Sequence, residues 1–219
     1  CYPIFLTESH INDSYKVYCR GILWPIFHYL MPTNDYNFGN NYEKYWQSYV
    51  GLNNLYAKKA CVAATDGTDY DCDVSDYIIW FHDYHLLLAP HFVRRQIPLA
   101  QIGLFLHTTF PTSEVFRCLP TRKEILRGIL SSDLVGFHTY DYARHFLSSC
   151  KRVLDLDFHT LPDDGTIAIH YLGRDVSLRI SHVSVLSHDI HKTAQSQKVR
   201  HIRDNYWKKK LNINNKKII

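Results

Sequence analysis

Two clusters of polar side chains that could perform chemistry each follow a short apolar run. Residues 78–81 (IIWF) lead into HDYH at 82–85, and residues 102–106 (IGLFL) lead into HTT at 107–109. A carboxylate accepts hydrogen bonds from hydroxyl groups, and a neutral imidazole either donates or accepts one. Such groups can bind a sugar, although Asp and His in these places also serve structural purposes.

The apolar runs predict the elements that position these clusters. A continuous apolar run of this length is typical of a strand buried on both faces, as in a parallel sheet. Residues 86–96 between them predict a helix, with Arg94 and Arg95 near its end where cations suit the helix dipole. Strand, helix and strand make a βαβ unit, and ligands of open α/β sheets lie beyond the carboxyl ends of the strands. Both clusters are at such ends.

The remainder of the chain continues the alternation of strands and helices. A third buried strand is predicted at 134–137, a hairpin at 166–171 and 176–180, and marginal strands at 1–6 and 182–185. Helices are predicted at 42–64, 113–118, 122–130 and 140–154, and one that runs to Arg20 from Asn12 or Ser14 as N-cap. Loops are expected at 33–41 and 65–75. The fold class is therefore α/β, with a Rossmann-like, mostly parallel sheet layered with helices.

Charge is unevenly distributed along the chain. The net charge is +4, but residues 186–219 alone hold nine Lys or Arg and two Asp. We expect one domain at 1–185 and a basic tail at 186–219, divergent or disordered because it is polar and lacks apolar alternation. The alternative is a surface helix bearing Val199, Ile202 and Tyr206. The larger part is slightly acidic, which argues against a nucleic-acid partner.

Composition limits the remaining classes. No apolar run approaches the roughly 20 residues that span a bilayer, so no membrane partner is expected. The six cysteines form no CxxC pair, which favours reduced thiols and a cytoplasmic location. No HExxH occurs, so neither a metal nor a cofactor is expected. The chain begins with Cys1 rather than Met, which indicates an internal fragment.

Three stretches carry a longer and more specific pattern. HDYHL at 82–86, IGLFLHTTFPTSEVFRCLP at 102–120 and DLVGFHTYDYARHFLSSC at 133–150 lie in one nearly unbroken segment. This segment resembles trehalose-phosphate synthase, a family that transfers glucose from UDP-glucose to glucose 6-phosphate with retained configuration. The resemblance weakens toward LWPIFHY and YWQSYVGLN upstream and fades after about residue 185. It implies the N-terminal, acceptor-side half of a GT-B glycosyltransferase, one that contributes mainly positioning and electrostatics.

The resemblance also implies roles for particular residues. Asp83 corresponds to the aspartate that contacts the glucose 6-phosphate acceptor, and His107 to the histidine beside the donor glucose, so these two are the expected catalytic residues. Thr108 occupies a position linked to selection of the anomer. Tyr15 and Trp24, nine residues apart, match aromatic residues of the acceptor pocket. Substrate binding is therefore expected of all five.

Structural alternatives stand beside these roles. Asp83 could cap the following helix, since Asp is a favoured N-cap. His107 could be a satisfied structural histidine, and Tyr15 and Trp24 could be core or rim aromatics. Thr109 replaces the proline that the family usually has, which predicts a less rigid loop.

The resemblance also indicates which parts of the family's enzymes are expected outside residues 1–219. The family begins with a strand that carries an arginine and a glycine-rich loop, and a second domain holds the diphosphate with an Arg/Lys pair. We therefore expect an enzyme as the full-length parent, in a homo-oligomer or synthase complex, and no turnover by this fragment alone. The alternatives are a non-catalytic regulatory subunit that binds sugar phosphates or a catalytic partner, and a truncated product without function.

Overall fold

The structure is a computed structural model that describes residues 2–30, 39, 41–66 and 77–211, without the side chains of 66 and 207–211. These residues form two units that meet between His182 and Val183, and each unit is described by itself. The loop predicted at 33–41 and most of the loop predicted at 65–75 lie outside the described residues.

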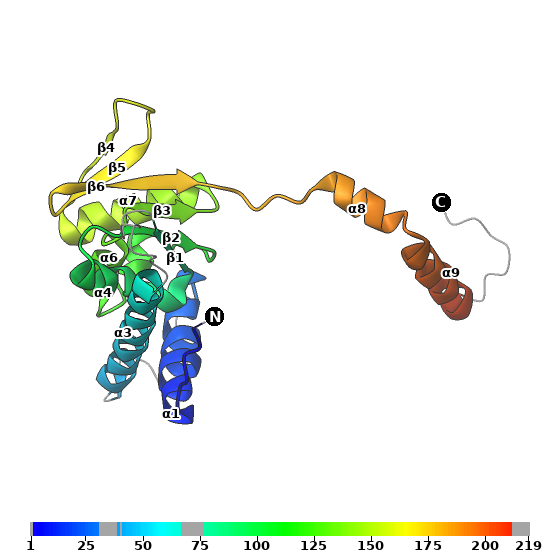
Figure 1. The fold of residues 1–219 in the computed structure, drawn as a ribbon, viewed down its shortest axis with the longest axis horizontal. Coiled ribbons are helices and arrows are strands. Elements are labelled where there is room, and N and C mark those ends of the chain that lie inside the picture. The colour runs from blue at the N-terminus through cyan, green and yellow to red at the C-terminus, as the bar shows by residue number, and fades with distance from the viewer. Residues whose placement is uncertain (1, 31–38, 40, 67–76, 212–219) are drawn as a thin grey trace. The chain divides into compact units, whose positions relative to one another are not determined.

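The first unit is built on a six-stranded sheet of order β1-β2-β3-β6-β5-β4 (Figure 1). The neighbours from β1 to β6 are parallel, and β6, β5 and β4 are antiparallel to one another. The strands are β1 (Ile78–His82), β2 (Gln101–Leu106), β3 (Leu134–Phe137), β4 (Phe158–Thr160), β5 (Ile167–Tyr171) and β6 (Arg174–Ile180). The three predicted buried strands and the hairpin are confirmed, and this is the mostly parallel α/β sheet that the sequence predicted.

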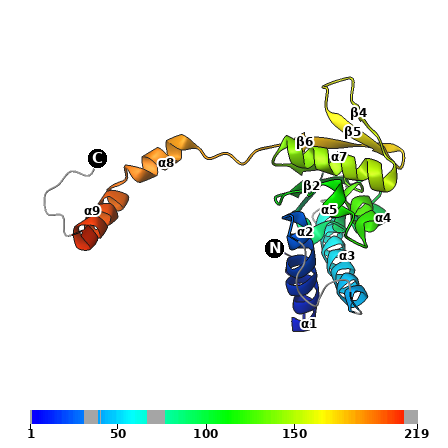
Figure 2. The same ribbon diagram turned by 180° about the vertical axis from the view of Figure 1, so that it is seen from behind.

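One face of the sheet packs against helices. On β2, Ile102, Leu104 and Leu106 are buried and point to that face. Helix α4 (Ala89–Gln96) contacts β2, and α7 (Tyr140–Leu154) contacts β3 and β6, so α7 lies along the sheet beside β6 (Figure 2). Helices α3 (Tyr42–Asp66), α5 (Ser113–Phe116) and α6 (Arg122–Ile129) also contribute to this core.

On the opposite face of the sheet, an aromatic ring of one strand lies over a glycine of the neighbouring strand. A Cβ at Gly103 would come within 2.7 Å of the Trp80 ring, and one at Gly136 within 2.3 Å of the Phe105 ring. Each glycine therefore allows the aromatic ring of the neighbouring strand to lie flat on the sheet. A pocket of about 460 Å³ on this face includes Trp80, Phe105 and Arg179 in its lining.

Asp133 joins the amino ends of the strands. Its carboxylate accepts two 2.7 Å hydrogen bonds from Arg94 Nη2 and one of 2.7 Å from the backbone N–H of Ile102. Arg174 adds a contact of 3.3 Å. These bonds tie α4, β2, β3 and β6 together at the edge opposite the two polar clusters.

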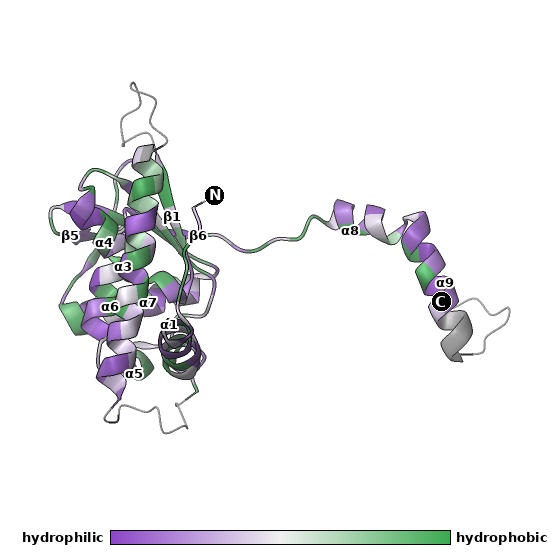
Figure 3. Cartoon of the chain, turned by 60° about the horizontal axis from the view of Figure 1, so that its bottom comes forward, coloured by the Kyte–Doolittle hydropathy of each residue, from purple (hydrophilic) through white to green (hydrophobic). Residues whose placement is uncertain are grey.

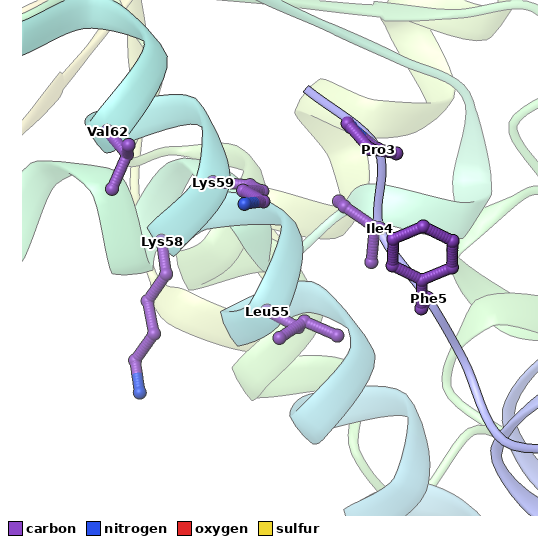
Figure 4. Close-up of a pocket in the computed structure, with 7 residues that line it drawn as sticks. All are labelled: Pro3, Ile4, Phe5, Leu55, Lys58, Lys59 and Val62. Atoms are coloured by element: carbon purple, nitrogen blue, oxygen red, sulfur yellow. The ribbon is translucent and has the colours of Figure 1, made fainter. Parts of the chain in front are cut away.

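The chain before α3 differs from the predicted strand and cap. Residues 2–7 have no regular secondary structure, and Figure 4 shows Pro3, Ile4 and Phe5 beside α3, where they share a pocket of about 330 Å³ with Leu55 and Val62. The strand prediction at 1–6 is wrong because an extended segment needs a partner strand, and here its apolar residues lie beside a helix. The first helical turn begins at Glu8, with Thr7 as N-cap rather than Asn12 or Ser14.

Three helical segments follow one another without a break from Glu8 to Phe27. They are α1 (Glu8–His10), the π-helix η1 (Ile11–Leu23) and α2 (Trp24–Phe27). The backbone N–H of Trp24 bonds to the carbonyl of Cys19, five residues earlier, as in a π-helix. A predicted helix is thus present, but it is wider than an α-helix.

The second unit contains α8 (Ser187–Ala194) and α9 (Gln197–Leu211), and Figure 3 shows both to be largely hydrophilic. Residues 183–186 have no regular structure, so the strand predicted at 182–185 is absent. The described part of the tail is mostly helical where we expected disorder, and the alternative of a surface helix with exposed Ile202 and Tyr206 fits. No described helix is long and apolar enough to cross a membrane.

Candidate functional site

Asp83 lies at the carboxyl end of β1 in an unusual backbone conformation. Its φ is 67° and its ψ is 174°, a region that only glycine adopts readily. Its N–H donates to the carbonyl of Phe105 at 2.7 Å, and its Oδ1 accepts the N–H of Thr108 at 3.2 Å. These bonds fix the carboxylate between the ends of β1 and β2. Backbone strain at a strand end is a common feature of ligand sites.

The helix-capping alternative for Asp83 does not fit this geometry. The chain turns through the 3₁₀ segment η3 (Tyr84–Leu86), and α4 begins only at Ala89, with Leu88 as its N-cap. The Asp83 side chain makes no capping bond to η3. Instead, the side-chain amide oxygen of Asn53 accepts the N–H groups of Leu88 and Ala89, each at 3.0 Å. Asn53 therefore caps the start of α4, and the Asp83 carboxylate is not used as a helix cap.

His107 stands beside a second histidine. Its Nε2 lies 3.0 Å from Nδ1 of His82, and its ring centroid is 5.5 Å from that of His138. Burial lowers the pKa of His107, the nearby Asp83 carboxylate opposes that shift, and the two histidines add to it. The neutral ring is thus favoured, as an imidazole that exchanges hydrogen bonds with a neutral sugar would need.

The π-helix explains how Tyr15 and Trp24 reach one place. Nine residues are two and a half turns of an α-helix with 3.6 residues per turn, which would put the two rings on opposite faces. A π-helix has about 4.4 residues per turn, so nine residues make about two turns and the rings share a face. Tyr15 stacks on His85 at 5.5 Å between ring centroids, and Trp24 lies 5.6 Å from Tyr84. Both aromatics therefore flank the turn that follows Asp83.

These aromatic rings are half exposed rather than part of the core. Tyr15 and Trp24 each keep 42% of their surface exposed. His85 Nδ1 lies 4.0 Å from Asp83 Oδ2, but burial lowers the pKa of His85 more than the carboxylate raises it, so the uncharged imidazole is favoured and the contact is not an ion pair at neutral pH. In the part of the chain that the structure describes, no hydrogen bond is seen to the phenol of Tyr15 or the indole N–H of Trp24.

Two threonines hold the loop after β2. Thr108 is buried, its N–H binds Asp83, and its Oγ1 has no hydrogen-bond partner among the described residues. Thr109 Oγ1 donates to the carbonyl of Phe27 at the end of α2. This bond ties the loop to a neighbouring element, and the lower rigidity expected from the missing proline stays a prediction.

The structure brings all five predicted residues to one edge of the sheet, around the carboxyl ends of β1 and β2. Other residues of the recognised motifs do structural work: Arg144 pairs with Asp141 at 3.1 Å, and Arg122 bonds to the carbonyl of Leu119. Sequence reasoning included His82 in a polar cluster but favoured a structural role and did not name it among the site residues. A signal for a further role was present in the sequence, because His82 ends one predicted strand and His107 follows the next one.

A pocket of about 430 Å³ adjoins this site. It is lined by polar Tyr15, His82 and His85 and by apolar side chains that include Leu6 and Leu86. It extends the aromatic side of the site toward the N-terminal segment. Within the described part of the chain, no group of three or more His, Cys, Asp or Glu side chains is placed to hold a metal.

Comparison with known proteins places this chain in a family. The family model described as Glycosyltransferase family 20 matches residues 1–219, so the similarity does not fade at residue 185. "Probable alpha,alpha-trehalose-phosphate synthase [UDP-forming] 11" of Arabidopsis thaliana is 40% identical over 211 residues, which are 94% of this chain and 23% of that protein. The chain thus spans about a quarter of the length of such relatives.

Solved structures agree with the sequence match. The N-terminal domain of Candida albicans trehalose-6-phosphate phosphatase superposes with a TM-score of 0.76 at 31% identity, over 94% of this chain and 40% of that one. "Trehalose-6-phosphate from E. coli bound with UDP-2-fluoro glucose" gives a TM-score of 0.73 at 27% identity, over 91% and 41%. On sequence and fold together, the chain belongs to glycosyltransferase family 20, the family of the trehalose-phosphate synthases.

Proposed function

We propose that this chain is the acceptor-side part of a trehalose-phosphate synthase, which transfers glucose from UDP-glucose to glucose 6-phosphate and releases UDP. The observation that carries the proposal is the Asp83 carboxylate, held in a glycine-like conformation and not engaged as a helix cap. A fold does not keep such strain without compensation, and sites for ligands are where it is usually found.

Each residue of the site has a part in the proposed reaction. Asp83 accepts hydrogen bonds from acceptor hydroxyls, and its bond to the Thr108 N–H fixes the carboxylate beforehand. Tyr15 and Trp24 form the acceptor wall with a phenol and an indole N–H. His107, as a neutral imidazole, meets a hydroxyl of the donor glucose. This arrangement contributes positioning and preorganised dipoles.

The proposal extends to the organisation of the protein. Residues 1–182 supply one side of the site, and the segment after residue 183 begins a further unit of the same family protein, since the family match runs to residue 219. Groups that neutralise the donor diphosphate come from beyond these residues. A cytoplasmic location and assembly with further subunits remain predictions.

The test is an assay of UDP release by the full-length protein that contains this chain. We expect release only when UDP-glucose and glucose 6-phosphate are both present, with trehalose 6-phosphate as the second product. The 219-residue chain alone should release none. Absence of UDP release by a correctly folded full-length protein would refute the enzymatic proposal.

A regulatory, non-catalytic role is the second candidate. Its support is the similarity to the N-terminal domain of a trehalose-6-phosphate phosphatase, which shows that this fold also occurs in a protein named for a different reaction. The same assay separates the two, because a regulatory protein would bind glucose 6-phosphate in calorimetry and release no UDP.

A further inference from the structure

His82 and His107 form an imidazole pair across two neighbouring strands. His82 ends β1, and His107 follows β2 directly, in a register that pairs His82 with Phe105. His82 Nδ1 and His107 Nε2 are 3.0 Å apart, with ring centroids 5.2 Å apart. This is hydrogen-bond distance, so one ring donates an N–H and the other accepts it.

This bond constrains the protonation of the pair. If both rings were protonated, two N–H groups would face one another across 3.0 Å, so at least one ring is neutral while the bond exists. The Asp83 carboxylate beside the pair favours a positive charge on His107. His138, at the end of β3, and partial burial oppose it, and the net pKa of His107 is lowered. The balance favours a neutral His107 bonded to His82.

The His82 side chain contributes little to the packing of the fold. The ring is exposed and lies on the sheet face opposite the helices, the same side as Trp80, whose ring centroid is 6.2 Å away. His107 makes its only described hydrogen bond to His82. Loss of the His82 imidazole therefore removes the restraint on the His107 ring without opening the core.

We propose that His82 is a positioning residue for His107: through the Nδ1 to Nε2 bond it holds the His107 ring in one orientation and one neutral tautomer before the donor sugar binds. The proposal rests on the proposed function for the sugar contact of His107. The bond engages Nε2 and leaves Nδ1 for a ligand: Nδ1 carries the proton when Nε2 accepts from His82, and it is an acceptor when Nε2 donates. A free imidazole would present a mixture of tautomers and orientations.

The primary test is a ¹⁵N spectrum of the histidine rings in the 219-residue chain, without substrate. In the wild type, His107 should appear neutral and as one tautomer at pH 7.5. His82→Phe keeps an aromatic ring but has no nitrogen, so His107 should show averaged tautomers. His82→Asn places an amide close to the position of Nδ1; because an amide can donate or accept, it should restore the hydrogen bond to Nε2 and reduce the averaging.

His138→Phe is the matched control. It removes an imidazole at a similar ring distance from His107, but one that makes no hydrogen bond to it. The single tautomer should persist in this variant. Circular dichroism and the melting temperature of each variant verify the fold. Averaged tautomers in the wild type, or an unchanged His107 spectrum in His82→Phe, would overturn the proposal.

Kinetics of the full-length protein supply the second readout. His82→Phe should lower kcat/KM for UDP-glucose about three- to tenfold, the effect of one lost hydrogen bond, and leave the KM for glucose 6-phosphate unchanged. His82→Asn should recover most of the loss. Equal donor kinetics in wild type and His82→Phe would contradict the positioning role. A full-length protein without transfer activity but with a single His107 tautomer would refute the proposed function alone.

Discussion

The backbone of Asp83 makes a specific and unusual prediction about stability. Its φ of 67° with ψ of 174° is a conformation that costs a residue with a Cβ about 1–3 kcal/mol. Asp83→Gly relieves that strain, whereas Asp83→Ala keeps it. Both variants lose the carboxylate and its bond to the Thr108 N–H equally, so the difference between them isolates the backbone.

The expected magnitude follows from two opposing contributions. Glycine gains the strain energy of about 1–3 kcal/mol but loses about 0.4–1 kcal/mol because its unfolded chain is more flexible. Asp83→Gly should therefore be more stable than Asp83→Ala, by about 1.3 kcal/mol at the middle of these ranges and by about 2.6 kcal/mol at most. In most strand or helix positions the order is the opposite, with alanine more stable by about 0.5–1 kcal/mol.

The assay is urea denaturation of the two variants, followed by circular dichroism and analysed for the free energy of unfolding. In thermal melts, the same difference should appear as a Tm about 2–8 °C higher for glycine, given the size of the folded unit. Neither variant should use glucose 6-phosphate normally in the full-length protein. An alanine variant as stable as the glycine variant would refute the strain argument and, with it, the reason to read Asp83 as a functional residue.

Three further predictions concern pH, the strand-end network and the tail. Burial lowers the pKa of His85, so below the ordinary histidine pKa of about 6.5 the unfolded chain binds more protons than the folded chain. The free energy of unfolding should therefore fall as the pH drops through that range. Urea melts of wild type and His85→Gln at several pH values test this, and the fall should be shallower in the variant. Asp133→Asn leaves Arg94 and Arg174 close together without a counter-charge and should lower the free energy of unfolding by about 1–3 kcal/mol, so an unchanged urea midpoint would contradict the importance of this network. Helices α8 and α9 are short, and α8 buries no residue, so their backbone amides should exchange quickly with solvent. Removal of residues 183–219 should leave the melting temperature of the first unit unchanged. Strong amide protection in α8 and α9 would contradict this.

Much of the fold was predictable from the sequence because its strands are continuous apolar runs. The runs at 78–81, 102–106 and 134–137 can be buried only in a sheet, and the polar residues after them had to gather at one edge. That reasoning placed Asp83 and His107 together. It did not require knowledge of the tertiary structure, because parallel neighbours align their carboxyl ends.

Other features depend on tertiary contacts that leave no local signal. Hydrogen bonds between residues five apart have no characteristic residue pattern, so the π-helix that puts Tyr15 and Trp24 on one face could not be foreseen. The φ of Asp83 and the capping by Asn53, which is 35 residues from Leu88, depend on the packed structure. The short strand β4 was missed because it has only three residues and pairs at the sheet edge.

The tail shows the limit of composition as a guide. Its many basic residues and weak apolar periodicity predicted disorder, yet α8 and α9 are helical. Lys, Arg, Gln and Leu are good helix formers, so local propensity favoured a helix where the hydrophobic pattern did not. The family match runs to residue 219, so this segment is part of the matched region as well.

The central claim is that the Asp83 carboxylate binds the sugar acceptor, and the acceptor specificity constant of Asp83→Asn in the full-length protein tests it most directly. Asparagine keeps an oxygen for the Thr108 N–H and tolerates a positive φ better than most residues, so the fold should persist. Loss of charge-assisted hydrogen bonds of about 1.5–3 kcal/mol should lower kcat/KM for glucose 6-phosphate about ten- to a hundredfold. A specificity constant equal to that of the wild type, at an unchanged melting temperature, would contradict the account.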